Sequence, residues 1–413
     1  MSLGLLRGNA IVGQSGGPTA AINATLAGVI RGCMQSEAID TLYGALNGVE
    51  GMLDGRLCNL TEIFADEKDI VTLENTPAAA LGSCRLKLPK ANEKNDTYEK
   101  LFELFKKLNI RYFFYIGGND SMDTVAKLSA YAKTGDYEIR VMGVPKTIDN
   151  DLCGTDHTPG FGSAAKYIAA SLQEIIRDCA VYTVRAVTIV EIMGRDAGWL
   201  TASAALTGEV CGVAPDFVYL PEVTFNYDEF FEDVKAALEC HPNVVIAVSE
   251  GIRLPDGTLV GEDAQSGAVD AFGHKYLSGT GKVLEKAVKN EIGCKVRSVE
   301  LNILQRCASH IASKTDLAES VMVGRGAVAA AAEGATAQMA KFIRVSDVPY
   351  RSEVGFENIA DIANKVKDVP RSFINARGNN VTSECIKYIL PLIQGETAPE
   401  YKSGLPVHFA IER

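Results

Sequence analysis

The chain has 413 residues, 47% of them hydrophobic, and a net charge of −11. Its length favours two or three domains of about 150 residues each. The negative charge argues against a nucleic-acid or membrane-surface binder, because such proteins need a basic face. No apolar run reaches the roughly 20 residues that a membrane helix needs, so we expect no membrane partner.

Cysteine and histidine usage argues against disulfides and zinc. The 10 cysteines form no Cys-x-x-Cys pair, and the 5 histidines do not lie at zinc-ligand spacing. Residues 1–8 carry one arginine and no long apolar segment, so no targeting signal is visible. We therefore expect a cytoplasmic protein with reduced thiols.

Apolar strands alternate with helical segments along the chain. A strand is predicted at 9–13, and the helix after it has apolar residues at helical spacing, namely Ile22, Leu26, Val29 and Ile30. Later strands are predicted at 112–116, 140–144, 186–192, 216–220 and 244–248. This alternation predicts an α/β fold with a parallel sheet. Ligands bind beyond the carboxyl ends of such strands, where the loops of this chain carry unusual chemistry.

The first of these loops places Gly16 and Gly17 between a strand and a helix. Backbone amides at such a helix start can point at a phosphate. The loop lacks Gly-x-Gly-x-x-Gly and the Gly-Lys-Ser/Thr ending of a P-loop, so neither nucleotide site is supported. Residues 13–17 also match the Gly-x-Ser-x-Gly elbow of hydrolases, but an elbow normally follows several strands and a His-Gly motif is missing.

The loop at 117–121, Gly-Gly-Asn-Asp-Ser, again follows an apolar strand. Gly118 allows a ligand to approach closely, and Ser121 can cap the next helix. A side-chain oxygen of Asn119 or Asp120 could reach a magnesium ion. The alternative is a capped turn that binds nothing.

The loop at 145–151, Pro-Lys-Thr-Ile-Asp-Asn-Asp, is the most informative segment of the chain. Asp149 and Asp151 are separated by a single residue, so one can take a proton while the other orients its neighbour or holds a metal. Lys146 supplies the opposite charge. Such a loop could handle a phosphoryl group, although a plain surface turn is equally typical of this sequence.

Isolated charged residues follow other predicted strands. Arg85 or Arg195 could grip an anion, and Glu222 would suit sugar hydroxyls. Arg297 and Arg306 flank a further strand predicted at 298–305. Each residue alone is more typical of a solvated surface charge.

In this order, the segments resemble the phosphofructokinase family from residue 9 to about 334. The shared features are Ser-Gly-Gly with Asn23 downstream, Gly-Gly-x-x-Ser, Thr-Ile-Asp-Asn-Asp, Met-Gly-Arg with its following glycine, Pro-Glu and a late Gln-Arg. The resemblance implies two similar doubly wound lobes with mostly parallel sheets and an active site in the cleft between them.

The resemblance also implies a division of the chain. A phosphoryl-donor lobe is expected at 1–159 with 306–350, and a sugar-phosphate lobe at 160–305. The remainder, 351–413, would be an extension that packs on a lobe or an interface. A helix is predicted within it at 359–366.

The implied reaction is phosphoryl transfer to the 1-hydroxyl of fructose 6-phosphate. Asp149 would be the base, Asp151 would support it, and Arg195 and Lys146 would complete the catalytic set. Substrate ligands would be Thr147, Met193, Gly194, Glu222, Arg297 and Arg306. Because some of these arginines come from a neighbouring subunit in the family, a homodimer or homotetramer is expected.

The donor site implied by the resemblance consists of Gly16, Gly17, Arg85, Gly118, Asp120 and Ser121. ATP-using relatives have glycine where this chain has Asp120 and Lys146, whereas pyrophosphate-using relatives carry these two residues. A carboxylate at Asp120 adds negative charge where the α-phosphate of ATP would lie, and Lys146 can neutralise pyrophosphate. The resemblance thus implies pyrophosphate with Mg²⁺, and an ATP-dependent enzyme or a noncatalytic regulatory homologue remains as an alternative.

Three positions depart from the family pattern. Asn119 stands where many relatives have a magnesium-binding aspartate, so this ligand would be neutral, and the metal would be held by Asn119, by Asp120 or mainly by the phosphoryl donor. Ile303 replaces a histidine or tyrosine near the 6-phosphate, and Ala186 replaces an arginine that ATP-using relatives take from a neighbouring subunit. The metal and 6-phosphate ligands therefore stay open.

Overall fold

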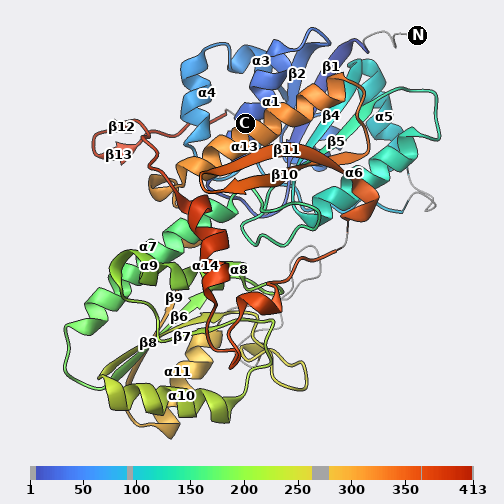
Figure 1. The fold of residues 1–413 in the computed structure, drawn as a ribbon. Helices are drawn as coiled ribbons and strands as arrows, with labels where there is room; N and C mark the ends of the chain where they lie inside the picture. Colours follow the sequence, from blue (N-terminus) through green and yellow to red (C-terminus); the bar gives the residue numbers. More distant parts are fainter. Residues whose placement is uncertain (1–5, 91–95, 263–278, 364, 412–413) are drawn as a thin grey trace.

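The structure is a computed structural model that describes residues 6–90, 96–262, 279–363 and 365–411. Two lobes, each built around its own sheet, are stacked one above the other (Figure 1). The α/β class and the mostly parallel sheets are as predicted. Within the described residues, no helix is both long and apolar enough to span a bilayer.

The first lobe contains a seven-stranded sheet in the order β11-β10-β5-β4-β1-β2-β3. Its strands are β1 (Gly8–Gln14), β2 (Ile39–Ala45), β3 (Leu57–Asn59), β4 (Ile110–Gly117), β5 (Arg140–Pro145), β10 (Gln338–Asp347) and β11 (Tyr350–Asn358). The two end strands, β3 and β11, pair antiparallel with their neighbours, and the other pairs are parallel. The central strands carry the predicted apolar runs and are almost wholly buried.

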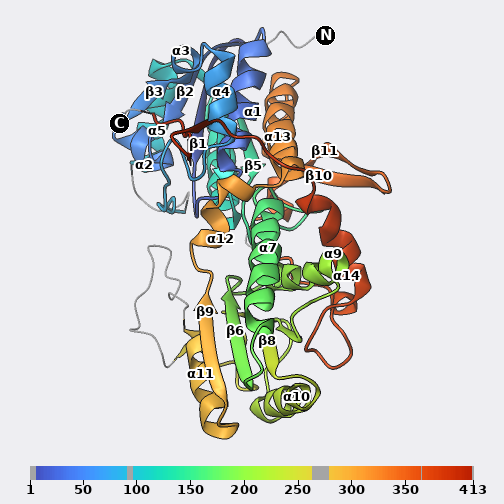
Figure 2. The ribbon, with the colours of Figure 1, turned by 90° about the vertical axis from the view of Figure 1, so that its left-hand side faces the viewer.

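Helices cover both faces of this sheet (Figures 1 and 2). One face is packed by α1 (Ile22–Gln35), α3 (Leu60–Ile63), α4 (Glu67–Glu74) and α13 (Lys314–Ala332), and the other by α2 (Gly48–Leu53), α5 (Thr97–Lys107) and α6 (Asn119–Ala132). Helices α1 and α13 cross at two glycines. A Cβ on Gly28 would lie 2.2 Å from Val321 O, and one on Gly324 would lie 2.3 Å from Thr25 O, so larger residues would force the helices apart.

The second lobe has a four-stranded parallel sheet in the order β7-β8-β6-β9. Its strands are β6 (Ala186–Ile192), β7 (Phe217–Tyr219), β8 (Asn243–Ser249) and β9 (Lys295–Glu300). The helices that accompany it are α7 (Phe161–Ala180), α8 (Trp199–Ala202), α9 (Thr207–Cys211), α10 (Tyr227–Cys240), α11 (Thr280–Glu291) and α12 (Leu304–Cys307), with a 3₁₀ turn at Ser203–Leu206. Figure 2 shows α7 and α12 close to the junction between the lobes.

Two predicted elements in the later part of the chain are wrong. The strand expected at 298–305 ends at Glu300, because Asn302 turns into the left-handed region at φ 44° and α12 follows. The helix expected at 359–366 is only a 3₁₀ turn at Ile359–Asp361. An antiparallel bridge from Val366 to Leu152 holds the chain extended there, so helical spacing alone was misleading.

The rest of the C-terminal part packs on both lobes. It contains α14 (Ser383–Ile389), 3₁₀ turns at Arg371–Phe373 and Leu390–Ile393, and the short pair β12 (Tyr401–Lys402) and β13 (Leu405–Pro406). The chain then returns to the first lobe, where the ring centroids of Phe409 and Phe64 are 4.7 Å apart (Figure 2). Because the β10–β11 hairpin belongs to the first sheet, the boundary expected at 350 falls inside it, and the domain division stays a prediction.

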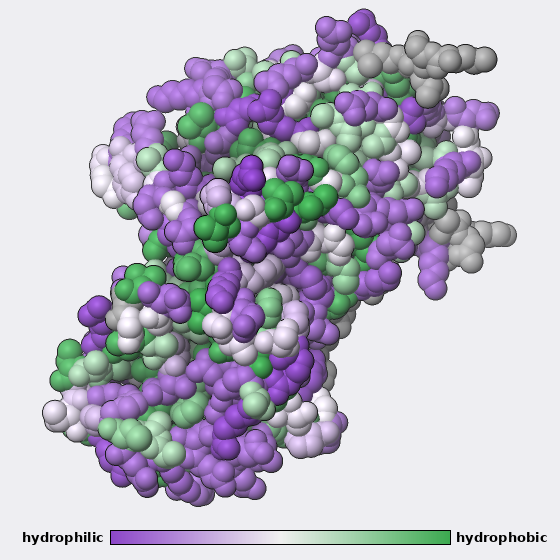
Figure 3. Space-filling view, in the orientation of Figure 1, coloured by the Kyte–Doolittle hydropathy of each residue, from purple (hydrophilic) through white to green (hydrophobic). Residues whose placement is uncertain are grey.

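Hydrophilic residues cover most of the face seen in Figure 3, with a hydrophobic group over the β10–β11 hairpin. Three apolar side chains of this hairpin region are exposed, namely Ile343, Val345 and Val348. The buried cores, by contrast, lie on the faces of the two sheets. The strands whose ends meet between the lobes are therefore packed by buried core residues on both faces of their sheets.

Candidate active site

A cavity of about 530 Å³ lies where the two lobes meet. Its walls include the loops that follow β1, β4 and β5 of the first sheet and β6 and β8 of the second. The carboxyl ends of the strands thus converge as predicted. Most of the predicted site residues line it, namely Gly16, Gly17, Arg85, Gly118, Asn119, Asp120, Ser121, Lys146, Thr147, Asp149, Asp151, Met193, Arg195 and Arg306.

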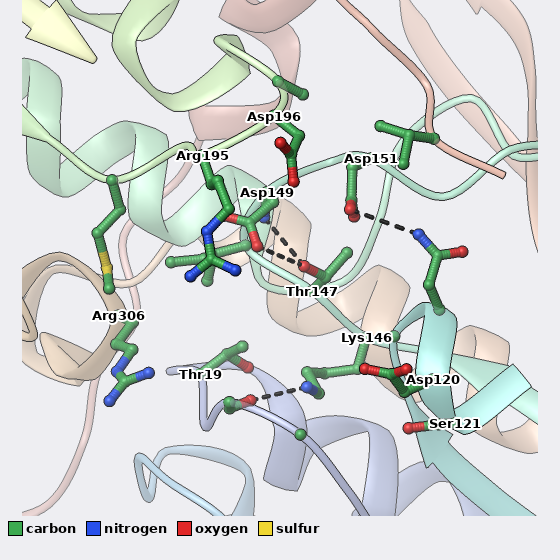
Figure 4. Close-up of a pocket in the computed structure, with 18 of the residues that line it drawn as sticks. Thr19, Asp120, Ser121, Lys146, Thr147, Asp149, Asp151, Arg195, Asp196 and Arg306 are labelled. Carbon is green, nitrogen blue, oxygen red and sulfur yellow. Dashed lines mark hydrogen bonds between the residues drawn. The ribbon is translucent and has the colours of Figure 1, made fainter. Parts of the chain in front are cut away.

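The loop after β5 turns between its two carboxylates. Asn150, the residue between them, adopts the left-handed φ of 54°, and Asp149 and Asp151 both line the cavity. The Asp149 amide donates to Thr147 Oγ1 at 3.1 Å, and that hydroxyl donates to Asp149 Oδ2 at 3.3 Å. Figure 4 shows Asp149 beside Thr147, with Asp151 pointing into the same space. The Asp149 carboxylate is therefore held in a fixed orientation.

Burial shifts the proton affinities of these carboxyl groups upward. It raises the pKa of Asp149, against the hydrogen bond from Thr147 and the charge of Lys146. Burial and the neighbouring Asp149 charge raise the pKa of Asp151 to about 7. Two carboxyl groups in one enclosed site resist double ionisation, so a proton can be accepted near neutral pH.

Lys146 is the buried cation of the same loop. Its side chain is 3% exposed, and Nζ donates to Gly17 O at 2.7 Å. Burial lowers the pKa of Lys146 to about 8, while the charges of Asp149 and Asp151 oppose that shift. The amine therefore lies between the glycine loop and the two carboxylates, where it can neutralise an anion.

The glycine loop after β1 leaves room for two cations. Gly16 has φ 78°, and a Cβ there would lie 3.2 Å from Lys146 Nζ. A Cβ on Gly17 would lie 3.3 Å from Arg306 Nη1. Burial and the charge of Arg85 lower the pKa of Arg306, which shows that the guanidinium groups share one enclosed region. The loop and its cations form an anion-binding surface.

Asp120 faces a lysine that the sequence did not single out. Lys87 Nζ lies 3.2 Å from Asp120 Oδ1, and both side chains line the cavity. Ser121 was expected to cap the following helix, but α6 begins at Asn119 after Gly118 and has no side-chain cap. Lys87 follows Arg85 by two residues in the same loop. This pair of basic residues was the sequence signal from which Lys87 could have been predicted as a site residue.

One orphaned acceptor in the cavity suits a metal ion. Asn119 Nδ2 donates to Asp151 Oδ2 at 3.4 Å, whereas Asn119 Oδ1 is buried and has no hydrogen-bond partner among the described residues. Within the same described residues, no group of three His, Cys, Asp or Glu side chains could hold a metal. One or two protein oxygens fit Mg²⁺ that arrives largely coordinated by substrate phosphates.

The second lobe contributes Glu250 rather than the predicted Glu222. Glu222 does not line the cavity, because its Oε1 accepts the amides of Gly198 at 2.8 Å and Val369 at 2.9 Å. Glu250 does line it and accepts the Gly194 amide at 3.2 Å. Burial raises the pKa of Glu250 to about 8. Glu250 lies two residues after the predicted strand at 244–248, and this position could have identified it as a site residue from the sequence.

Two further predicted ligands lie outside the cavity lining. Gly194 lies beside it, with φ 138°, between the lining residues Met193 and Arg195. Arg297 is on β9, where its side chain is 52% exposed and lies 3.7 Å from Asp178. It borders a separate hollow of about 90 Å³ that also includes Ala186. Arg297 therefore does not contribute to the cavity of its own chain.

Comparison with known proteins agrees with this arrangement. Residues 9–329 match the family model described as Phosphofructokinase. The chain is 42% identical to the pyrophosphate--fructose 6-phosphate 1-phosphotransferase of Halomonas elongata, over 96% of this chain and 94% of that protein. It is also 42% identical to the protein of the same name from Xanthomonas campestris pv. campestris, covering 99% and 97%.

Solved structures give the same result. The crystal structure of pyrophosphate-dependent phosphofructokinase from Nitrosospira multiformis superposes with a TM-score of 0.88 at 38% identity. The match covers 98% of this chain and 96% of that one. With the sheet order, the interlobe cavity and the family match in agreement, the chain belongs to the phosphofructokinase family.

Proposed function

We propose that the protein transfers a phosphoryl group from pyrophosphate to the 1-hydroxyl of fructose 6-phosphate, giving fructose 1,6-bisphosphate and phosphate. The observation that carries the proposal is the joint presence of Asp120 and Lys146 in the cavity wall beside the glycine loop. Relatives that share about 40% of the sequence over nearly their full length are named for this reaction. We also propose that the reaction is reversible, as the resemblance to the pyrophosphate-using branch of the family implies, and that it is a step of glycolysis.

Asp149 is proposed as the base. It accepts the proton of the 1-hydroxyl as that oxygen attacks the phosphorus, and the bond to the bridging oxygen of pyrophosphate breaks as phosphate leaves. Thr147 holds the carboxylate in place, and Asp151 supports its protonation by sharing the buried site. A positioned base of this kind commonly contributes about 10²–10⁴-fold in rate.

Arg195 and Lys146 are proposed to stabilise the charge that develops on the transferred group. They reach the cavity from different lobes, and Asp149 lies within electrostatic range of both (Figure 4). Preorganised cations in a water-poor site cost no reorganisation at the moment of transfer. The arrangement therefore favours the transition state over the bound substrates.

The sugar phosphate is proposed to bind toward the second lobe. Thr147, Met193, Gly194 and Glu250 would contact the sugar, with Glu250 taking the role first given to Glu222. Arg306 would bind the 6-phosphate of the sugar in the cavity of its own chain. Arg297, exposed on its own lobe, would serve the cavity of a neighbouring copy, so we propose a homodimer or homotetramer.

The donor is proposed to occupy the first-lobe side. Pyrophosphate would contact Arg85 and the amides near Gly16, Gly17, Gly118 and Ser121. ATP is disfavoured because Asp120 adds negative charge there, although an ATP-dependent enzyme of the same family stays the second candidate. A noncatalytic homologue is less compatible with a cavity that retains Asp149, Asp151 and Arg195.

Mg²⁺ is the proposed cofactor. The orphaned Asn119 Oδ1 and the Asp120 carboxylate would hold it, and the ion would neutralise the phosphates when bound. A cytoplasmic location is also proposed, since the cysteines whose side chains the structure describes are all free thiols.

The test is formation of fructose 1,6-bisphosphate by the purified protein with Mg²⁺, supplied with either pyrophosphate or ATP as the sole donor. The proposal predicts product with pyrophosphate and little with ATP. Activity with ATP alone would overturn the donor assignment and keep the family. No product with either donor, from a folded protein, would favour a regulatory role.

A further inference from the structure

A strap formed by residues 366–369 runs beside the loop that carries Asp149 and Asp151. Val366 forms an antiparallel bridge with Leu152 and also lines the cavity. The Lys367 amide donates to Asp151 O at 2.8 Å. The strap is therefore attached by backbone hydrogen bonds to the segment that carries the proposed base.

Lys367 places its ammonium group at the turn of that loop. Its Nζ donates to Asn150 Oδ1 at 3.3 Å, to Thr155 O at 3.4 Å and to Asp156 O at 2.7 Å. Asn150 is fully buried, and its amide nitrogen donates to the hydroxyl of Tyr388 at 3.0 Å. Both ends of the Asn150 side chain are thus held by the C-terminal part of the chain.

Asn150 needs such support because its backbone is left-handed at φ 54°. A residue with a Cβ pays roughly 1–2 kcal/mol for this conformation, although asparagine tolerates it better than most. Asn150 lies between Asp149 and Asp151, which both line the cavity. Contacts that fix the Asn150 side chain therefore fix the direction of both carboxylates.

The other side of the strap is attached to the second lobe. Lys367 O accepts the Trp199 indole N–H at 2.9 Å, and Lys367 Nζ lies 5.1 Å from the centroid of that ring. The Val369 amide donates to Glu222 Oε1, which also accepts the Gly198 amide. Trp199 and Gly198 immediately follow the loop that carries Arg195. The strap therefore joins the loop of the base to the loop of the arginine.

We propose that Lys367 is a positioning residue, whose ammonium holds Asn150 in its left-handed turn while the strap fixes the Asp149 loop against the Arg195 loop. The inference rests on the proposed role of Asp149 as the base. Burial lowers the pKa of Lys367 to about 8, against the charges of Asp156 and Asp151. The three hydrogen bonds of its ammonium group offset the cost of burying the charge. Lys365, two residues earlier, is exposed instead.

The first test compares Lys367→Met with Lys367→Arg and with the exposed control Lys365→Met. If Lys367 aligns the loop, Lys367→Met lowers kcat by about 10–100-fold, since a displacement near 1 Å can cost that much. The KM values for fructose 6-phosphate and pyrophosphate should stay near those of the wild type. Lys367→Arg should recover part of the rate, and Lys365→Met should behave as wild type. A Lys367→Met protein with wild-type kcat would overturn the proposal.

A double-mutant cycle separates positioning from general destabilisation. Asn150→Gly keeps the left-handed turn accessible but removes the side chain that Lys367 holds. If Lys367 acts through Asn150, the double variant should be no slower than the slower single variant, whereas losses that multiply would contradict the proposal. Should Lys367→Met fail to fold, as judged by far-ultraviolet circular dichroism, wild-type kcat in Asn150→Gly would overturn it instead. An inactive wild type would contradict the proposed function, not the strap.

Discussion

The two lobes contribute to the cavity in different ways. The first lobe presents three loops after β1, β4 and β5, and every site residue predicted on these loops lines the cavity. The second lobe presents Arg195 and Met193 as predicted, but Glu250 replaces Glu222, and Arg297 lies elsewhere. A contiguous run of turn-forming and charged residues therefore locates a site more securely than a single charged residue after a strand.

The lobes also differ in how their charges are balanced. In the first lobe, burial lowers the pKa of Lys146 to about 8, and the opposite charges of Asp149 and Asp151 oppose that shift. In the second lobe, burial raises the pKa of Glu250 to about 8, and the like charge of Asp149 adds to that shift. A carboxyl group that keeps its proton at neutral pH can donate a hydrogen bond to a sugar hydroxyl as well as accept one. On the proposed assignment, the donor side neutralises charge and the sugar side recognises hydroxyls.

The strongest test of the first-lobe assignment is Asp149→Asn. The amide cannot accept the hydroxyl proton, so kcat should fall by about 10³-fold while both KM values change little. Steady-state kinetics of bisphosphate formation measure this, with the exposed Asp40→Asn as control. A loss smaller than about tenfold would mean that another group serves as the base.

Arg195→Ala tests the main catalytic residue proposed on the second lobe. Loss of a cation aimed at the transferred group should lower kcat by about 10²-fold. The surface variant Arg325→Ala is a suitable control, because Arg325 is exposed on α13 far from the cavity lining. If Arg195→Ala changed only the KM for pyrophosphate, the arginine would be a donor ligand and not a transition-state group.

The paired variants Glu250→Gln and Glu222→Ala sharpen the contrast between a site carboxyl and a structural one. Glu250→Gln should raise the KM for fructose 6-phosphate by about tenfold or more, because a hydrogen-bonding group facing the sugar is altered. Glu222→Ala should leave that KM unchanged and cost about 1–3 kcal/mol of stability, since two amides lose their acceptor. The reverse pattern in kinetics and thermal unfolding would restore the original assignment to Glu222.

The smallest expected effect is a pH dependence of stability. Because the folded pKa of Glu250 lies near 8, above its usual value of 4.5, the ligand-free folded state binds more protons between these pH values. Stability from this group is therefore fully present below about pH 4.5 and is lost as pH rises toward 8. Glu250→Gln should flatten the decline in Tm over this range by about 2–4 °C. An unchanged slope would contradict the shifted pKa.

Much of the fold was predictable because it follows local patterns. The strands at the centre of the first sheet are continuous apolar runs, and α1 has apolar residues at helical spacing. The two wrong predictions lie where a long-range bridge or a local turn overrides the spacing of apolar residues. The bridge between Val366 and Leu152 prevents the helix expected at 359–366, and the left-handed Asn302 ends β9 early.

The site residues that lie together in one loop could be predicted from the sequence. Asp149, Asp151 and Lys146 are close in sequence, so their proximity in space follows directly. Lys367 is more than two hundred residues away and carries no motif, yet it contacts Asn150 of the same loop. Such long-range partners depend on how the C-terminal segment packs, which residue spacing does not encode.

Asp120 and Lys146 are proposed to select pyrophosphate over ATP. The most direct measurement is the ratio of kcat/KM for the two donors in the wild type and in the double variant Asp120→Gly with Lys146→Gly. We expect a ratio that strongly favours pyrophosphate in the wild type and shifts toward ATP by about 10²-fold or more in the variant, since charge repulsion is relieved and the neutralising amine is lost. An equal fall with both donors would contradict it, because the two residues would then serve catalysis or folding without choosing the donor.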